Sequence, residues 1–262
     1  MAALRPETPL RAWFDALHRA WGPQGWWPGR TRFEIIVGAI LTQGVSWTNV
    51  EMAIGALRRA RLLAPARLLA APPGEVARCI RATGYFNQKA RKLLEFAAFL
   101  RQCHEGRVDR LFREPTGALR RQLLDLPGIG PETADSILLY AGGRPVFVID
   151  AYTRRILARH GAATGLEPYE TMRFGCESAL PADPRLFNEF HALIVRAGKE
   201  HCRRNVPRCS GCPLEPFLPA GGPVPFESSG RRTGMRPGRA IRHPARRAGT
   251  VRRKGRSRTP PD

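Results

Sequence analysis

The chain has 262 residues, of which 43% are hydrophobic, so it is long enough to bury a large core. A formal net charge of +21 favours a nucleic acid as the binding partner. No segment has the uninterrupted apolar length of a membrane span, and we expect a cytoplasmic protein that does not bind membranes. Six cysteines in a long chain without a secretory pattern indicate free thiols or a metal site rather than a disulfide scaffold.

Most of the chain up to Leu218 shows the apolar spacing of helices, as at Leu93, Ala97 and Leu100. Proline and glycine pairs separate these helical stretches. The one extended-looking run, residues 145–149, cannot form a sheet alone. The pattern therefore predicts an all-α protein.

Residues 219–262 differ sharply in composition from the rest of the chain. They hold 12 Lys or Arg against two acidic residues and almost no large apolar side chains. Such a segment buries too little surface to offset its ordering entropy, so we expect a disordered basic tail. Two roles stay open for it, a solvated tail without a function and an addition to salt-dependent DNA affinity.

Residues 116–141 predict two helices joined by a tight glycine turn. Thr116 can cap the first helix, and Pro131 suits the first position of the second. Glycines let the backbone approach closely, and free N–H groups at the second helix can bind a phosphate without reading sequence. The candidate DNA-backbone contacts are Gly128, Ile129 and Gly130. The alternative is an ordinary corner between helices, since a glycine turn alone is common.

Asp150 precedes a predicted helix over Ala151–Arg159, and in isolation it would be an N-cap. The stretches LPGIGPETAD and FVIDAYTRRIL, and the spacing between them, resemble the signature of the helix-hairpin-helix-GPD DNA glycosylases of the endonuclease III type. The resemblance covers about residues 10–218. It implies a two-lobed, all-α fold and an enzyme of base excision repair.

The resemblance assigns the catalytic carboxylate to Asp150. Breaking an N-glycosidic bond develops oxocarbenium-like charge on the sugar, which a fixed carboxylate stabilises while it positions water. Bifunctional members of the family carry a lysine in the second hairpin helix, where it forms a Schiff base and permits strand cleavage. This chain has Glu132 at that position, which implies a monofunctional glycosylase, although a glutamate there also favours the helix dipole.

The N-terminal region resembles the 3-methyladenine DNA glycosylase branch of the family, on residues 26–28, 33–43, 47 and 84–90. In that branch aromatic residues and a proline line the pocket for the flipped base, which implies a pocket of Trp26, Trp27, Pro28 and Trp47. A methylated adenine is cationic, and an indole face attracts a cation. Packing is the alternative role for at least one of the paired tryptophans. Gln43 matches the residue that fills the gap left in the duplex.

Cys202, Cys209 and Cys212 follow the spacing of the family's [4Fe–4S] loop, but the fourth cysteine position is Leu218. Three outcomes stay open: a cluster with a different fourth ligand, a three-iron or labile cluster, and a metal-free loop.

The expected architecture is a six-helix bundle of residues 33–141 and a second helical lobe of residues 1–32 and 142–218. We expect a nucleoid-associated monomer that acts on double-stranded DNA with a damaged base, an alkylated purine by the resemblance. Two alternatives are the same fold acting on oxidised pyrimidines or mismatches, and a catalytically degenerate DNA-binding protein.

Overall fold

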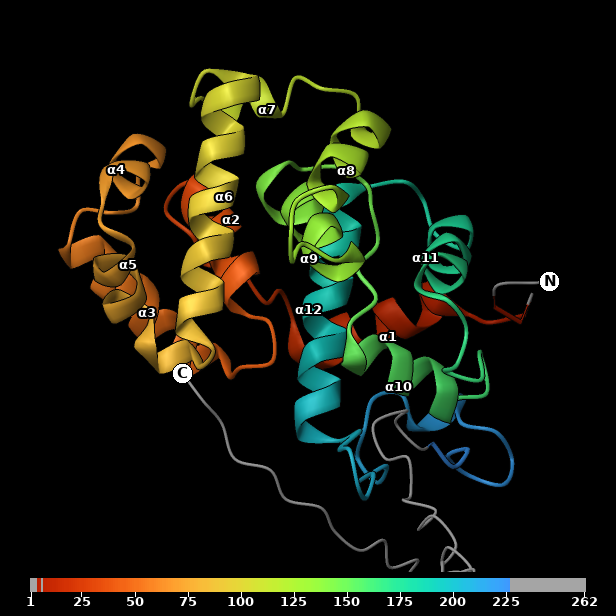
Figure 1. The fold of residues 1–262 in the computed structure, drawn as a ribbon. Helices are drawn as coiled ribbons and strands as arrows, with labels where there is room; N and C mark the ends of the chain where they lie inside the picture. The colour runs from red at the N-terminus through yellow and green to blue at the C-terminus, as the bar shows by residue number, and fades with distance from the viewer. Residues whose placement is uncertain (1–3, 6, 227–262) are drawn as a thin grey trace, which may run out of the picture. The chain divides into compact units, whose positions relative to one another are not determined.

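The computed structural model describes residues 4–5 and 7–226, and in this part of the chain all regular secondary structure is helical (Figure 1). The α-helices are α1 Leu10–Trp21, α2 Arg32–Leu41, α3 Trp47–Arg59, α4 Pro65–Ala70, α5 Pro73–Cys79, α6 Phe86–His104, α7 Val108–Leu111, α8 Thr116–Leu124, α9 Pro131–Ser136, α10 Ala151–Arg159, α11 Tyr169–Ser178 and α12 Pro184–Glu200. Two short 3-10 helices are η1 Arg81–Thr83 and η3 Glu215–Phe217, and η2 Ile137–Ala141 is a π-helical turn. The predicted all-α class is confirmed. None of the described helices combines the length and hydropathy that a bilayer span requires.

Two apolar cores organise the helices. Side chains between Phe33 and Val146 form the first core, and side chains of residues 4–17 and 139–214 form the second. The cores share the segment 139–146, which lies next to the predicted lobe boundary. Helix α12 packs against α10, α1 and η2 and runs through the middle of the helices in Figure 1. The π turn η2 and helix α12 therefore meet where the two cores adjoin.

The starts of α10 and α8 test two of the local signals in the sequence. The Asp150 carboxylate accepts a hydrogen bond from the Thr153 N–H and begins α10 at Ala151. Thr116, predicted as a cap, is instead the first residue of α8. Pro115 stands at the N-cap position, where its restricted φ already suits a helix start, so the helix begins one residue earlier than predicted.

The beginning of the predicted tail packs onto the helical part. The Val224 N–H donates to the Arg159 carbonyl at 2.8 Å, and the Phe226 ring lies against Gly165. Val224 and Phe226, beyond the predicted boundary at residue 219, therefore contact the helical part. The rest of the predicted tail, residues 227–262, lies outside the described residues.

Candidate active site

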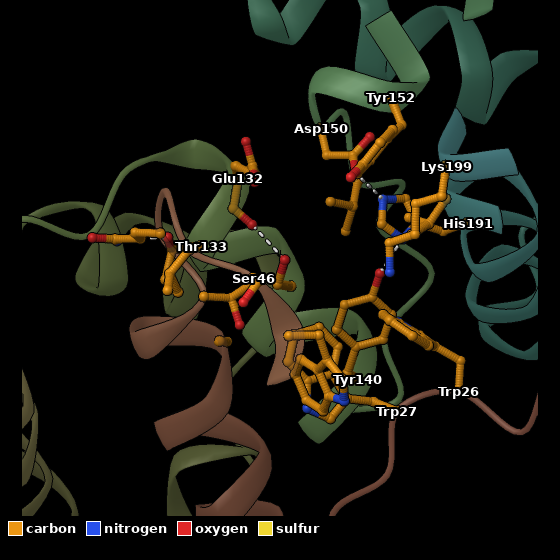
Figure 2. Close-up of a pocket in the computed structure, with 18 of the residues that line it drawn as sticks. Trp26, Trp27, Ser46, Glu132, Thr133, Tyr140, Asp150, Tyr152, His191 and Lys199 are labelled. Atoms are coloured by element: carbon orange, nitrogen blue, oxygen red, sulfur yellow. Dashed lines mark hydrogen bonds and ion pairs between the residues drawn. The ribbon is translucent and has the colours of Figure 1, made fainter. Parts of the chain in front are cut away.

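A cavity of about 310 Å³ opens where α9, η2, the start of α10 and α12 meet the segment between α2 and α3 (Figure 2). The predicted base-pocket residues Trp26, Trp27 and Trp47 line it, together with Asp150 and Gln43. Pro28 is exposed and is absent from the lining. The structure therefore brings together three of the four predicted pocket residues and the predicted carboxylate.

The indoles form one continuous wall of this cavity. The Trp27 ring meets Trp47 edge to face at 4.9 Å between centroids, and Tyr140 lies 4.8 Å away on another side. A Cβ built on Gly38 of α2 would lie 3.1 Å from the Trp27 Nε1, so glycine lets this indole pack against the helix. Trp26 contacts both other tryptophans, and its peptide bond to Trp27 is cis. Trp27 therefore packs as a wall residue and faces the cavity as well.

Asp150 is held at the mouth of the cavity by the helix that it caps. One carboxylate oxygen accepts from the Thr153 N–H at 2.7 Å, and the other lies 3.7 Å from the His191 Nε2. The Asp150 side chain is 13% exposed. Capping fixes the position of the charge, and the exposed fraction leaves it accessible from the cavity. The two roles expected for this residue are geometrically compatible.

Glu132 lies in the first turn of α9 and also lines the cavity. Burial among the cavity walls and, second, the Asp150 charge raise the pKa of Glu132 to about 7, while Arg154 opposes this change. By surface area the residue is exposed at the rim, where water screens its charge. Near neutral pH the carboxyl therefore exchanges between its neutral and charged forms at the lining of the cavity.

Gln43, the predicted gap-filling residue, is tied to the hairpin. Its Nε2 donates to the Gly128 carbonyl at 3.0 Å and to the Thr133 Oγ1 at 2.9 Å. Its Oε1 accepts from the Lys92 Nζ at 2.5 Å. Entry into a duplex would exchange these bonds for contacts with DNA, and the gap-filling role stays a prediction.

The hairpin turn between α8 and α9 presents two exposed glycines and one buried apolar residue. Gly128 has φ +80°, a conformation that favours glycine, and a Cβ built there would lie 2.3 Å from the Lys92 Cε, so a larger residue would also displace the Lys92 side chain. Ile129 is 5% exposed and anchors the turn in the first core. Gly130 is exposed and precedes α9. The Ile129 N–H donates to the Leu126 carbonyl at 3.0 Å, and phosphate binding by this turn stays a prediction.

Three further cavity residues come from positions that the sequence did not single out. Tyr140 belongs to η2, and His191 and Lys199 belong to α12. His191, Val195 and Lys199 follow each other at intervals of four, so they share the face of α12 that borders the cavity. This spacing was a usable signal for a common face, but nothing local indicated which cavity that face would border.

The predicted metal ligands Cys202, Cys209 and Cys212 line a second, much smaller cavity together with Leu218. The side chain at the fourth position is a hydrocarbon and cannot ligate iron. In residues 4–5 and 7–226 no group of three or more His, Cys, Asp or Glu side chains is disposed to hold a metal ion. The Cys202 thiol instead accepts from the Arg159 Nη1 at 3.4 Å. The residues present therefore do not fit a four-thiolate cluster.

Comparison with known proteins places the hairpin and Asp150 inside a matched region. The model of the HhH-GPD superfamily base excision DNA repair protein matches residues 37–182. A Methanocaldococcus jannaschii protein named as a DNA repair glycosylase is 40% identical over 199 residues, 75% of this chain and 90% of its own. The structure of H. pylori 3-methyladenine DNA glycosylase bound to 1,N6-ethenoadenine has a TM-score of 0.66 and 26% identity, covering 73% of this chain and 97% of that one. A non-covalent endonuclease III–DNA complex shares the fold at a TM-score of 0.67 and 22% identity, covering 80% and 93%.

Proposed function

Because the chain belongs to the HhH-GPD superfamily of base excision DNA repair proteins, we propose that it is a monofunctional DNA glycosylase that removes flipped alkylated purines such as 3-methyladenine. DNA glycosylase activity and DNA binding go with the family. The choice of base and the absence of strand cleavage are argued from this chain's own residues.

The observation that carries the proposal is the indole-walled cavity with Asp150 at its mouth. Its volume of about 310 Å³ lies near the lower end of small-molecule sites, as suits a single base. A purine methylated at a ring nitrogen is cationic, and the faces of Trp26, Trp27 and Trp47 favour a cation over a neutral pyrimidine. In Figure 2 the labelled indoles lie at one end of the cavity and Asp150 and Glu132 at the other.

Hydrolysis follows from the position of the carboxylate. As the bond to the base breaks, positive charge develops on the deoxyribose, and Asp150 stabilises this charge and positions a water molecule. An alkylated purine is already a good leaving group because it departs as a neutral base. The site therefore needs a fixed negative charge more than a strong general acid.

Glu132 supports the absence of strand cleavage. A carboxylate cannot form the Schiff base that a lysine at this place forms in bifunctional relatives. The amine that does line the cavity, Lys199, comes from α12 and lies over Trp26, with its Nζ 6.0 Å from the ring centroid. Its charge faces an indole, so we assign it to the wall of the pocket rather than to attack on the sugar.

The relationship to a 3-methyladenine DNA glycosylase solved with a modified adenine supports the same class of base. The competing class of base is an oxidised or mismatched pyrimidine, the alternative that the sequence left open.

Base release from a panel of lesions tests the proposal. The purified protein is incubated with methylated DNA, with duplexes that contain thymine glycol and with a thymine–guanine mismatch, and free bases are quantified by mass spectrometry. The proposal predicts release of 3-methyladenine well above release from the two pyrimidine substrates. Preferential release of thymine or thymine glycol would contradict the alkylated-purine proposal and favour pyrimidine substrates. No release from any duplex would favour the catalytically degenerate DNA-binding alternative.

For the cysteine loop we propose that arginines rather than iron hold it in place. The Arg159 guanidinium donates to the Cys202 thiol and to the carbonyls of Arg203 and Arg204. The Arg155 guanidinium donates to the Cys202 carbonyl at 2.7 Å. These charge-assisted bonds fix the start of the loop without a fourth ligand.

A further inference from the structure

Tyr140, His191 and Asp150 form a line of contacts along one side of the cavity (Figure 2). The Tyr140 hydroxyl lies 2.5 Å from the His191 Nδ1, and the His191 Nε2 lies 3.7 Å from the second oxygen of Asp150. The residues come from η2, α12 and the start of α10, so the line joins three elements at the site.

The His191 Nε2 stands out among buried polar atoms near the site. His191 is 4% exposed, and its Nε2 has no hydrogen-bond partner within the described part of the chain. Burial of an unsatisfied polar atom costs free energy, which an apolar residue at this position of α12 would avoid. The Asp150 carboxylate lies beside this atom, at 3.7 Å, so the orientation of the ring relates to that carboxylate.

The proton positions follow from burial. Burial lowers the pKa of His191, although the Asp150 charge opposes this, and burial raises the pKa of Tyr140. The ring is therefore neutral and the phenol protonated. When the phenol donates to Nδ1, the single ring proton resides on Nε2 and points toward the negative Asp150. The other tautomer would place a lone pair against that charge.

We propose that His191, held in its Nε2–H tautomer by Tyr140, is a positioning residue that fixes the orientation of the Asp150 carboxylate toward the deoxyribose. The inference rests on the proposed function. The Thr153 N–H anchors one carboxylate oxygen, and the His191 N–H directs the second, so together they define the plane of the carboxylate. At 3.7 Å the second contact is longer than a hydrogen bond, so it acts as a directed dipole in this structure.

The test separates positioning from packing by comparing three histidine variants in single-turnover release of 3-methyladenine. His191→Leu removes the N–H and should lower the rate about 10- to 100-fold, because a misplaced catalytic group can cost about 100-fold in rate. Its affinity for a duplex with a tetrahydrofuran abasic analogue should change by less than about twofold. His191→Gln keeps a donor near the Nε2 position and should restore most of the rate. His104→Leu, the control, removes another buried histidine with an unpartnered Nε2, on α6, and should leave the rate unchanged.

Ring nitrogen NMR of the folded protein supplies a second readout. The wild-type spectrum should show His191 with its proton on Nε2, and Tyr140→Phe should mix the tautomers and lower the release rate with little change in affinity. The inference is overturned if His191→Gln is as slow as His191→Leu, if only affinity changes, or if the proton resides on Nδ1. If His191→Leu does not fold, the release rates and affinities of His191→Gln and Tyr140→Phe test the inference instead. Full activity of Asp150→Asn would instead overturn the proposed catalyst, whatever the histidine variants show.

Discussion

Asp150 has two separable roles in this structure, and paired substitutions should separate them. Its carboxylate caps α10 through the 2.7 Å bond from the Thr153 N–H and carries the negative charge at the mouth of the cavity. Asparagine keeps an oxygen that can accept this bond and is as good an N-cap as aspartate. Alanine removes both the cap and the charge.

The capping bond sets the expected stability change. Loss of an N-cap lowers the free energy of unfolding by about 1 kcal/mol, which shifts the Tm of a chain this size by about 2–4 °C. Asp150→Ala should show this decrease. Asp150→Asn should not, because it keeps the cap and relieves repulsion with Glu132, whose pKa the Asp150 charge raises.

The charge sets the expected change in activity. Removing one preorganised electrostatic group from a transition state slows a reaction by about 100- to 1000-fold. Both variants should therefore lose single-turnover base release by this factor, while thermal melting separates them. Asp150→Asn with the wild-type rate, or two variants whose rates follow their Tm values, would refute the separation of capping from catalysis.

Three further predictions concern the rim, the hairpin and the cysteine loop. Since the pKa of Glu132 is raised from 4.5 to about 7, the folded state binds more protons between these values, so the free energy of unfolding falls as pH rises through this range. Release of a cationic base should rise as the charged form appears near pH 7, and Glu132→Gln should flatten both profiles. Gly128→Ala forces a left-handed φ on alanine and displaces Lys92, so chemical denaturation should show that the free energy of unfolding falls by about 1–3 kcal/mol. Gly130 has a negative φ and open space around it, so Gly130→Ala should leave the free energy of unfolding unchanged. Arg159→Met should lower the Tm because it removes the charged donor that binds the carbonyls of Arg203 and Arg204. Iron and sulfide analysis of the wild-type protein should find less than one cluster per chain, and a stoichiometric cluster would contradict the arginine account.

Local signals explain how much of the site could be predicted from the sequence. The glycine turn, Pro131 and the cap at Asp150 each act within a few residues, so the hairpin and the helix Ala151–Arg159 appear where the sequence placed them. The paired tryptophans and Trp47 line the same cavity, which local pattern alone does not require but the family resemblance implied.

What the sequence could not supply depends on packing between distant segments. His191 lies on a mostly buried helix and looks like any core position until α12 is placed against η2. The π turn that carries Tyr140 has no local breaker to indicate it. Pro28 is adjacent in sequence to two pocket residues, yet it points to solvent, because the chain turns away after Trp27. Val224, which lies beyond the change in composition at residue 219, likewise contacts α10, and no local pattern indicated this contact.

Product analysis on one duplex with a single 3-methyladenine tests the central claim most directly. Free base, abasic sites and strand breaks are counted in the same sample, with borohydride added to a parallel reaction to trap any Schiff base. The account predicts free 3-methyladenine in equal number to intact abasic sites, breaks only after alkali, and no protein–DNA adduct. Breaks without alkali together with a trapped adduct would contradict it, because an amine rather than a water molecule positioned by Asp150 would then be attacking the sugar.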